Sequence, residues 1–404
     1  MVNSSLNVVM IGPFAFKPKG TVSARAFFMA RALAKRGHRV TILMPPYDNP
    51  EDSGRAWEED GVLLENMVLG EDSAYSRVVV PLRMARRTMK LVPDVIHVFK
   101  PVAYSGLAGM YLRLFSGYPL VLDTDDWEGT GGWNDVNDYP RLGKRLFDWQ
   151  ERWLPRHADA VTVASRTLQA QVWGFGVDPS RVIYLPNGPD ARLRGQSGVS
   201  GAEKAAIRQS LGVGGAPLAL YLGHIPAGTD LDLAIDALAA LGDRLPEARL
   251  VIAGVGHGLA GLQRHAQAAG VAGRVVFPGW VEHDQAHRYV AAADVIVNPY
   301  RDTLINRAKC AGKVVSAMAL GKPVITSRIG ENLEYIEDGR SGLLVEPGDV
   351  GALAEALAAV LSEPGLAESL GRNARQRIWA RFDWERRTAE VERAYGMARQ
   401  GRGQ

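Results

Sequence analysis

The chain has 404 residues, which exceeds the length at which a single hydrophobic core usually stops growing, so we expect two domains. Hydrophobic residues make up 47% of the chain and charged residues 23%, as in an ordinary folded protein, and the net charge of +3 is too small to indicate a nucleic-acid-binding surface. The single cysteine, Cys310, excludes an intramolecular disulfide, and the eight histidines lack the Cys/His spacing of zinc sites. No apolar stretch reaches the roughly 20 residues of a membrane span, so we expect a cytoplasmic protein.

Short β-branched segments alternate with helical patterns along the whole chain, which predicts βαβ units and parallel sheets. In the first half the predicted strands are 8–11, 40–44, 95–99, 120–122, 161–163 and 182–185. In the second half they are 218–222, 250–253, 275–277, 295–297, 324–326 and 343–345. The pattern therefore predicts an α/β protein with two doubly wound sheets.

A polar stretch rich in Gly and Ser, from Asn187 to about Ala202, separates the two sets of strands. We therefore expect an N-terminal domain over 1–190, a linker over 191–215 and a C-terminal domain over 216–378. A final helix within 379–404 is expected to pack back on the N-terminal domain.

The segment 77–91 combines apolar residues with five cations, as a basic amphipathic helix on an anionic membrane would. Such a pattern is also typical of a solvated helix face, and both interpretations stay open.

An acidic loop, residues 123–133, follows the predicted strand 120–122 and holds four carboxylates and two tryptophans. Ligands of parallel sheets bind at the carboxyl ends of the strands, where carboxylates can bind hydroxyls and an aromatic ring can hold a sugar face. The loop therefore favours an acceptor site. Two alternatives remain: Asp123-Thr124-Asp125 could be an Asp-x-Asp metal motif that holds a diphosphate, or the loop could be a solvated turn with core tryptophans.

A basic segment follows the predicted strand 295–297, with Arg307, Lys309 and Lys313 in the first turns of a helix predicted to run to about Leu320. Cations are unfavourable at a helix N-terminus, and the i, i+4, i+7 spacing places Lys309, Lys313 and Ser316 on one face. A phosphate bound between them would compensate these charges without a metal ion. The alternative is a solvated basic helix start.

The run 309–323, KCAGKVVSAMALGKP, resembles the donor-binding signature of retaining family-4 glycosyltransferases with the GT-B fold. The resemblance continues through 334–339 and 342–349 and covers essentially the whole chain, including Gly12, YLPNG at 184–188, IAGVG at 252–256 and FDW at 382–384. It implies two Rossmann-like domains facing across a cleft. It also implies a metal-independent hexosyltransferase without a resident cofactor, which moves a sugar with retention from a nucleotide-diphosphate-sugar donor to a hydroxyl-bearing acceptor.

The sequence departs from the family pattern at the donor site. Many members carry two glutamates separated by seven residues, where this chain has Ala308 and Ser316, and a Gly-Arg pair where it has Gly223-His224. A later lysine of the pattern falls near 228–230, where this chain has none. Either the three cations of the basic segment substitute for the missing arginine and lysine, or the donor carries less charge. A catalytically silent homologue that acts as a binding or partner subunit, and a phosphorylase or epimerase of the same fold, remain as alternatives.

These arguments give the candidate site residues. The candidate catalytic residues are Asp125, Asp126, Arg307 and Lys309. The candidate donor-binding residues are Gly20, Gly223, His224, Gly254, Asn306, Lys313, Ser316 and Glu334. The candidate acceptor-binding residues are Trp127, Glu128 and Trp133, for a saccharide, lipid-linked or small-molecule acceptor, and no residue is assigned to a metal. The protein is expected in the cytoplasm, with the inner face of the membrane as an alternative location through 77–91.

Overall fold

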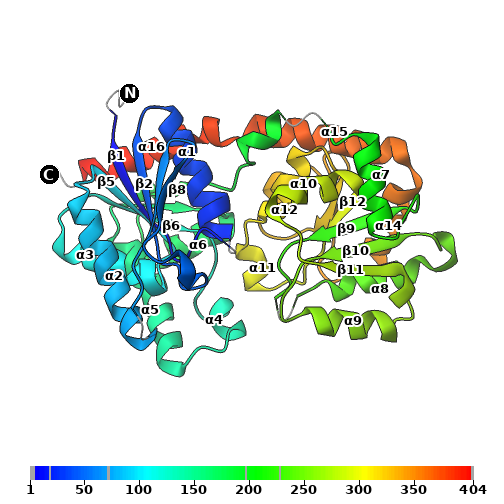
Figure 1. Ribbon diagram of the computed structural model, residues 1–404, viewed down its shortest axis with the longest axis horizontal. Coiled ribbons are helices and arrows are strands. Elements are labelled where there is room, and N and C mark those ends of the chain that lie inside the picture. Colours follow the sequence, from blue (N-terminus) through cyan, green and yellow to red (C-terminus); the bar gives the residue numbers. More distant parts are fainter. Residues whose placement is uncertain (1–4, 18–19, 71–72, 196–197, 227–228, 402–404) are drawn as a thin grey trace. The chain divides into compact units, whose positions relative to one another are not determined.

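A computed structural model describes residues 5–17, 20–70, 73–195, 198–226 and 229–401, without the side chains of residues 73–77 and 283 (Figure 1). The chain forms two compact units. Unit 1 comprises Met1–Gly188, Ala308–Cys310 and Trp384–Gln404, and unit 2 comprises Pro189–Arg307 and Ala311–Asp383.

Within the described residues, unit 1 contains an eight-stranded sheet in the order β3-β4-β2-β1-β5-β6-β7-β8. Its strands are β1 (Asn7–Ile11), β2 (Arg39–Met44), β3 (Ala56–Glu59), β4 (Val62–Asn66), β5 (Val95–Phe99), β6 (Leu120–Thr124), β7 (Ala160–Val163) and β8 (Val182–Tyr184). Neighbouring strands are parallel, except that β3 and β4 form an antiparallel hairpin. The six strands predicted in this half are confirmed.

The sequence analysis missed the β3–β4 hairpin at the edge of the sheet. Its turn is Asp60-Gly61, and both residues have positive φ angles, 49° and 77°. An Asp-Gly pair is a strong hairpin signal, but β3 is rich in carboxylates and lacks a β-branched run. The Asp-Gly turn was therefore the sequence signal that could have predicted this hairpin, whereas the residue pattern of β3 could not.

Helices cover both faces of the unit 1 sheet. Helices α1 (Phe27–Lys35) and α16 (Trp384–Gln400) pack on one face, and α2 (Ser73–Lys90) and α3 (Ala103–Phe115) pack on the other (Figure 1). The remaining helices of this unit are α4 (Trp133–Val136), α5 (Arg141–His157) and α6 (Arg166–Gly174). Tyr395 of α16 is fully buried, and its hydroxyl lies 3.0 Å from Nδ1 of the buried His97 on β5. The last helix is thus part of the core of unit 1.

Helix α2 contains most of the basic segment 77–91, and part of its described apolar surface faces the core, whereas Val78 is 63% exposed. Val80 and Met84 are fully buried, and Arg87 forms a bidentate ion pair with Glu65 at 2.9 Å. The side chain of Arg77 lies outside the described residues. The part that the structure describes therefore uses its apolar face for packing on the sheet.

No single helix in the described ranges is both long enough and apolar enough to cross a membrane. One pair joined at a 101° bend, Val350–Ser362 with Pro364–Gln400, meets the length and composition criteria only when the two are taken together.

In the described part of unit 2, six parallel strands form a sheet in the order β11-β10-β9-β12-β13-β14. The strands are β9 (Leu218–Leu222), β10 (Arg249–Ala253), β11 (Val275–Gly279), β12 (Val295–Asn298), β13 (Val324–Ser327) and β14 (Leu343–Val345). All six strands predicted in this half are confirmed. The chain thus has two parallel-sheet α/β domains, as predicted.

The helices of unit 2 also lie on both faces of its sheet. Helices α8 (Asp232–Leu241), α9 (Leu259–Ala268) and α14 (Val350–Ser362) cover one face, and α10 (His283–Ala292) and α12 (Gly312–Ala319) cover the other. The remaining helices are α7 (Gly201–Ser210), α11 (Leu304–Ala308), α13 (Asn332–Tyr335) and α15 (Pro364–Arg381). Helix α7 lies inside the predicted linker and begins with a capping box formed by Ser200 and Glu203.

The strand order reverses once in each sheet, between β1 and β5 in unit 1 and between β9 and β12 in unit 2. Ligands of doubly wound sheets bind beyond the carboxyl ends of the strands at such a reversal. The loops after Ile11, Phe99, Leu222 and Asn298 are therefore the places to examine first.

Candidate functional site

Two loops of unit 2 pack backbone against backbone at the strand-order reversal. Gly223 follows β9, and Gly254 and Gly256 follow β10, and all three have φ angles close to +150°. A Cβ atom at Gly254 would lie 1.9 Å from the carbonyl oxygen of Gly223, and one at Gly256 would lie 2.0 Å from that of Ile225. Only glycine allows this close approach of the two backbones.

Lys313, in the first turn of α12, lies directly against this loop. Its amine is 4.0 Å from the centre of the Tyr221 ring and donates a hydrogen bond to the Tyr221 hydroxyl, which itself donates to the carbonyl oxygen of His224 at 2.8 Å. A Cβ atom at Gly223 would lie 2.9 Å from Nζ of Lys313. Burial lowers the pKa of Lys313 to about 7.

The other two cations of the basic segment lie elsewhere, because the predicted continuous helix is broken. Helix α11 ends at Ala308 and α12 begins at Gly312, so the expectation that Lys309, Lys313 and Ser316 share one helix face is wrong. Asn187 explains the break: its side-chain amide donates to the carbonyl oxygen of Cys310 at 2.9 Å, and its backbone N–H donates to the Cys310 sulfur at 3.1 Å.

Arg307 and Lys309 have different environments from Lys313. Arg307 is exposed and forms a bidentate ion pair with Asp302, with both distances 2.6 Å. Lys309 belongs to unit 1 by its contacts, and its amine lies 5.1 Å from the centre of the Trp133 ring. Of the three cations, Lys313 is the one that the fold places at the β9 loop.

The other predicted donor residues are dispersed over their units. Asn306 is buried and donates to Asp230 at 2.7 Å and to the carbonyl oxygen of Arg301 at 2.9 Å, so it stabilises the loop after β12. His224 is exposed in the β9 loop, Ser316 is half-buried in α12, and Glu334 is half-buried in α13. In unit 1, Gly20 is the N-cap of the short helical segment Thr21–Ala26.

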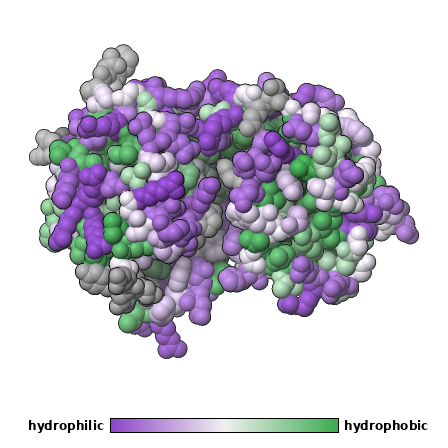
Figure 2. All heavy atoms as spheres, viewed as in Figure 1, coloured by the Kyte–Doolittle hydropathy of each residue, from purple (hydrophilic) through white to green (hydrophobic). Residues whose placement is uncertain are grey.

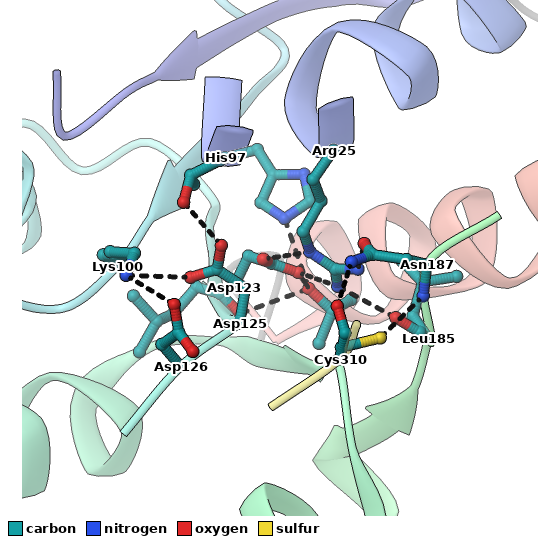
Figure 3. Close-up of polar contacts among 12 residues, drawn as sticks. Arg25, His97, Lys100, Asp123, Asp125, Asp126, Leu185, Asn187 and Cys310 are labelled. Atoms are coloured by element: carbon teal, nitrogen blue, oxygen red, sulfur yellow. Dashed lines mark hydrogen bonds and ion pairs between the residues drawn. The ribbon is translucent and has the colours of Figure 1, made fainter. Parts of the chain in front are cut away.

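A buried ion pair organises the acidic loop of unit 1 (Figure 3). The Arg25 guanidinium binds both carboxylate oxygens of Asp123 at 2.7 Å, and it also donates to the carbonyl oxygen of Leu185 and to the side chain of Asn187, each at 2.9 Å. Thr162 donates to the same carboxylate at 2.6 Å. Asp123 is thus engaged on both oxygens by the protein itself, which disfavours the Asp-x-Asp interpretation.

Lys100 is a site residue that the sequence analysis missed. It directly follows β5 with a positive φ of 62°, and its buried amine lies 2.6 Å from Glu128, 3.2 Å from Asp126 and 3.7 Å from Asp125. Burial alone would lower the pKa of this amine, but the three carboxylates raise it well above its usual value. The available signal was a lysine immediately after a strand at the strand-order reversal.

Asp125 is buried beside this lysine, and its Oδ1 is the oxygen that lies 3.7 Å from the lysine amine. Its Oδ2 accepts a hydrogen bond from the Thr21 hydroxyl at 2.7 Å, whereas its Oδ1 has no hydrogen-bond donor among the described residues. Burial, opposed by Lys100 and assisted by Asp126, raises the pKa of Asp125 to about 6. A buried acceptor without a donor is unfavourable, so a ligand hydroxyl at Oδ1 would stabilise this arrangement.

The two tryptophans of the acidic loop have different environments. Trp127 is buried, stacks on Phe175 at 5.8 Å, and donates from its indole N–H to the carbonyl oxygen of Thr130 at 2.9 Å. Trp133 is half-buried beneath Lys309. Trp127 therefore packs in the core, as the alternative interpretation of the loop proposed, whereas Trp133 keeps part of its ring accessible.

Within the described residues, no group of three or more His, Cys, Asp or Glu side chains is placed to hold a metal ion.

Comparison with known proteins identifies the family of this chain. Residues 203–377 match the family model of glycosyl transferases group 1, and residues 20–188 match that of the glycosyl transferase 4-like domain. A GDP-mannose-dependent α-(1-6)-phosphatidylinositol monomannoside mannosyltransferase of Mycobacterium tuberculosis is 30% identical over 391 residues, which cover 93% of this chain and 94% of that enzyme. The chain belongs to the group 1 glycosyltransferases.

Other relatives and a solved structure agree with this family assignment. The same-named mannosyltransferase of Mycolicibacterium smegmatis is 31% identical over 59% of this chain and 61% of its own length, and a glycogen synthase of Mycobacterium tuberculosis is 29% identical over 95% of this chain and 93% of its own. The crystal structure of Anabaena HepE in complex with UDP-glucose superposes with a TM-score of 0.75, at 18% identity, over 96% of this chain and 99% of that chain. The fold is therefore GT-B.

The contact between the β9 and β10 loops generates a prediction about stability. We expect Gly254→Ala to destabilise unit 2 by about 2 kcal/mol or more, because the new Cβ collides with the Gly223 carbonyl at a strained φ. The matched control is Gly261→Ala in α9, where the Cβ meets nothing within 4 Å and should stabilise the helix by about 0.5–1 kcal/mol. Urea denaturation of both variants measures the difference, and equal stabilities would contradict the packing described.

Proposed function

We propose that this glycosyltransferase uses a nucleotide-diphosphate-sugar donor, whose phosphates bind the β9 loop and Lys313 in unit 2. The observation that carries the proposal is the position of the Lys313 amine over Gly223, at the strand-order reversal. This cation is partly buried, its pKa is lowered to about 7, and the described residues provide no carboxylate that pairs with it. An anion bound at this position would supply the missing countercharge.

Comparisons with relatives support a nucleotide-sugar donor without identifying it. HepE has been crystallised with UDP and with UDP-glucose, and the mycobacterial mannosyltransferases are named as GDP-mannose-dependent. Where many family members carry two glutamates, this chain has the fully buried Ala308 and the half-buried Ser316. The nucleobase of the donor is therefore to be identified by nucleotide-binding measurements.

The proposed chemistry is electrostatic. As the bond from the sugar to the phosphate breaks, negative charge grows on the leaving diphosphate, and a cation already held at that place stabilises the transition state. We extend the proposal to retention of configuration and to metal independence. Retention rests on the family resemblance. Metal independence also rests on Asp123, whose oxygens are held by Arg25.

On the acceptor side, we propose that Asp125 receives a hydrogen bond from the hydroxyl that is glycosylated. Its Oδ1 is the buried oxygen without a donor, and Lys100 and Thr21 fix the position of the carboxylate. Lys100 acts through Asp125, Asp126 and Glu128 and is a positioning residue. The acceptor class proposed is a saccharide, a lipid-linked sugar or a small polyol.

The alternative function is a catalytically silent homologue that serves as a binding or partner subunit. The replacement of both family glutamates, by Ala308 and Ser316, is the observation that favours it. It differs from the proposal in a measurable way, because a silent homologue need not bind nucleoside diphosphates.

Nucleotide binding tests the donor site. We expect at least one of UDP, GDP, ADP and dTDP to bind with unchanged affinity in excess EDTA, and Lys313→Met to weaken that binding by about 10- to 100-fold, because one charge-assisted contact is lost. Wild-type affinity should also fall above pH 7, because free Lys313 is then neutral and must gain a proton on binding. Isothermal titration calorimetry across pH 6–9 measures both effects.

The matched control is Lys322→Met. Lys322 is another partly buried lysine of unit 2 with a pKa lowered to about 8, but its amine donates to the carbonyl oxygen of Ala293. This variant should bind nucleotide as the wild type does. Equal binding by Lys313→Met and Lys322→Met would contradict the assigned donor site, and a wild type that binds none of the four nucleotides would favour the silent homologue.

The pH dependence of transfer tests Asp125. We expect kcat/KM for the acceptor to fall below about pH 6, because the carboxylate then takes up a proton and Oδ1 becomes a poorer acceptor. Asp125→Asn should lower kcat/KM by roughly 10- to 100-fold and remove this acid limb. Release of nucleoside diphosphate from the donor measures the rate. Asp135→Asn, in α4 directly after the acidic loop, is the control, and an acid limb that persists in Asp125→Asn would refute this role.

A further inference from the structure

Helix α5 of unit 1 has a stripe of exposed apolar side chains. Hydrophilic residues cover most of the visible surface of both units, with smaller apolar areas between them (Figure 2). Leu142 is 78% exposed, Leu146 is 37% exposed and Trp149 is 45% exposed, and the half-buried Trp153 packs against Trp149 at 5.8 Å. At about 100° per residue, these four side chains fall within an arc of about 60° on the helix. The stripe therefore forms one continuous ridge.

The opposite face of α5 is used by the fold. Gln150, Glu151 and Leu154 are buried, and α5 packs against α3. The helix thus makes its core contacts through this opposite face, and the exposed stripe is a separate surface.

Cations line one flank of the stripe. Arg141, Arg145, Arg152 and Arg156 fall within a second arc of about 60°, next to the apolar one. All four are exposed. Arginine side chains so placed can keep their charged ends in water while the stripe enters an apolar phase. Leucine and tryptophan on one face with arginine beside them is typical of helices that lie in a membrane interface.

A pocket of about 310 Å³ with charged residues in its lining adjoins the same flank. Lys144, Arg145 and Arg152 line it together with Asp135, Asp148 and Trp149, so three cations face two carboxylates. Asp148 is already engaged, because it accepts the backbone N–H of Thr130 at 2.9 Å and pairs with Arg152 at 3.4 Å. The remaining positive charge suits an anionic headgroup.

We propose that α5 docks this protein on an anionic lipid surface, with the stripe of Leu142, Leu146, Trp149 and Trp153 in the interface and the arginine flank on the headgroups. The proposal is independent of the donor and acceptor assignments, because it uses none of their residues. It also differs from the interpretation of segment 77–91, in which Val80 and Met84 are buried in the core and Val78 is exposed.

Vesicle co-sedimentation with the full chain tests the proposal. We expect binding to vesicles of phosphatidylcholine with about one third phosphatidylglycerol, weak binding to phosphatidylcholine alone, and release at high salt. Leu142→Glu combined with Trp149→Glu should reduce partitioning at least about tenfold, because two anchors are lost and two repelling charges are gained. Arg141→Glu combined with Arg145→Glu should remove the preference for the anionic vesicles.

The chain offers a matched control at the end of α3. Leu114 and Phe115 are 60% and 69% exposed, and Leu114→Glu combined with Phe115→Glu makes the same chemical change on a neighbouring helix, outside the stripe. This variant should bind vesicles as the wild type does, and all variants should melt at the wild-type temperature because the changed side chains are exposed. Absence of wild-type binding to anionic vesicles, or equal losses in the α5 and α3 variants, would overturn the proposal. So would a wild-type dimer that the α5 variant abolishes, since the stripe would then bind a second copy.

Discussion

The bidentate ion pair between Arg25 and Asp123 is the interaction on which the polar centre of unit 1 depends. It joins the helical segment after the first strand to the end of β6, and the same guanidinium holds Leu185 and Asn187 beyond β8. Removing one member of such a buried pair typically costs 3–5 kcal/mol, because the other charge is left uncompensated. With Asp123 fixed in this way, the residues that follow it on the loop are placed within reach of Lys100.

The buried or half-buried cations Arg25 and Lys100 of unit 1 and Lys313 of unit 2 differ in how their charge is compensated. Arg25 is matched by Asp123, and Lys100 is surrounded by Asp125, Asp126 and Glu128, which raise its pKa despite burial. Lys313 is held against the Tyr221 hydroxyl and the β9 loop, and burial lowers its pKa to about 7. A cation whose charge the protein itself does not match suits a ligand that brings the countercharge. This difference, together with the position of Lys313 at the β9 loop, is why Lys313 carries the proposed function.

The strands were predictable because a parallel sheet buried on both faces requires continuous β-branched runs, and all twelve predicted runs form strands. The family was equally readable from the segment 309–323. The position of each cation could not be predicted from the sequence, because the break between α11 and α12 depends on Asn187, more than 100 residues away in sequence. Lys100 was missed because one lysine after a strand carries no motif, and only the strand order shows that β5 borders the reversal. The inward packing of Trp127 and the exposed stripe on α5 likewise follow from tertiary contacts, since core and surface aromatic residues look alike in a sequence.

The pKa of Lys313 itself is the most direct test of the account, and NMR of the protein with ¹³C-labelled lysine can follow it, with Lys313→Arg to assign the signal. In the free protein the pKa should be about 7. With a saturating nucleoside diphosphate it should rise above about 9, because a bound phosphate stabilises the charged amine. A pKa that stays near 7 while the nucleotide is bound would show that the phosphates lie elsewhere, and would contradict the central role given to this lysine.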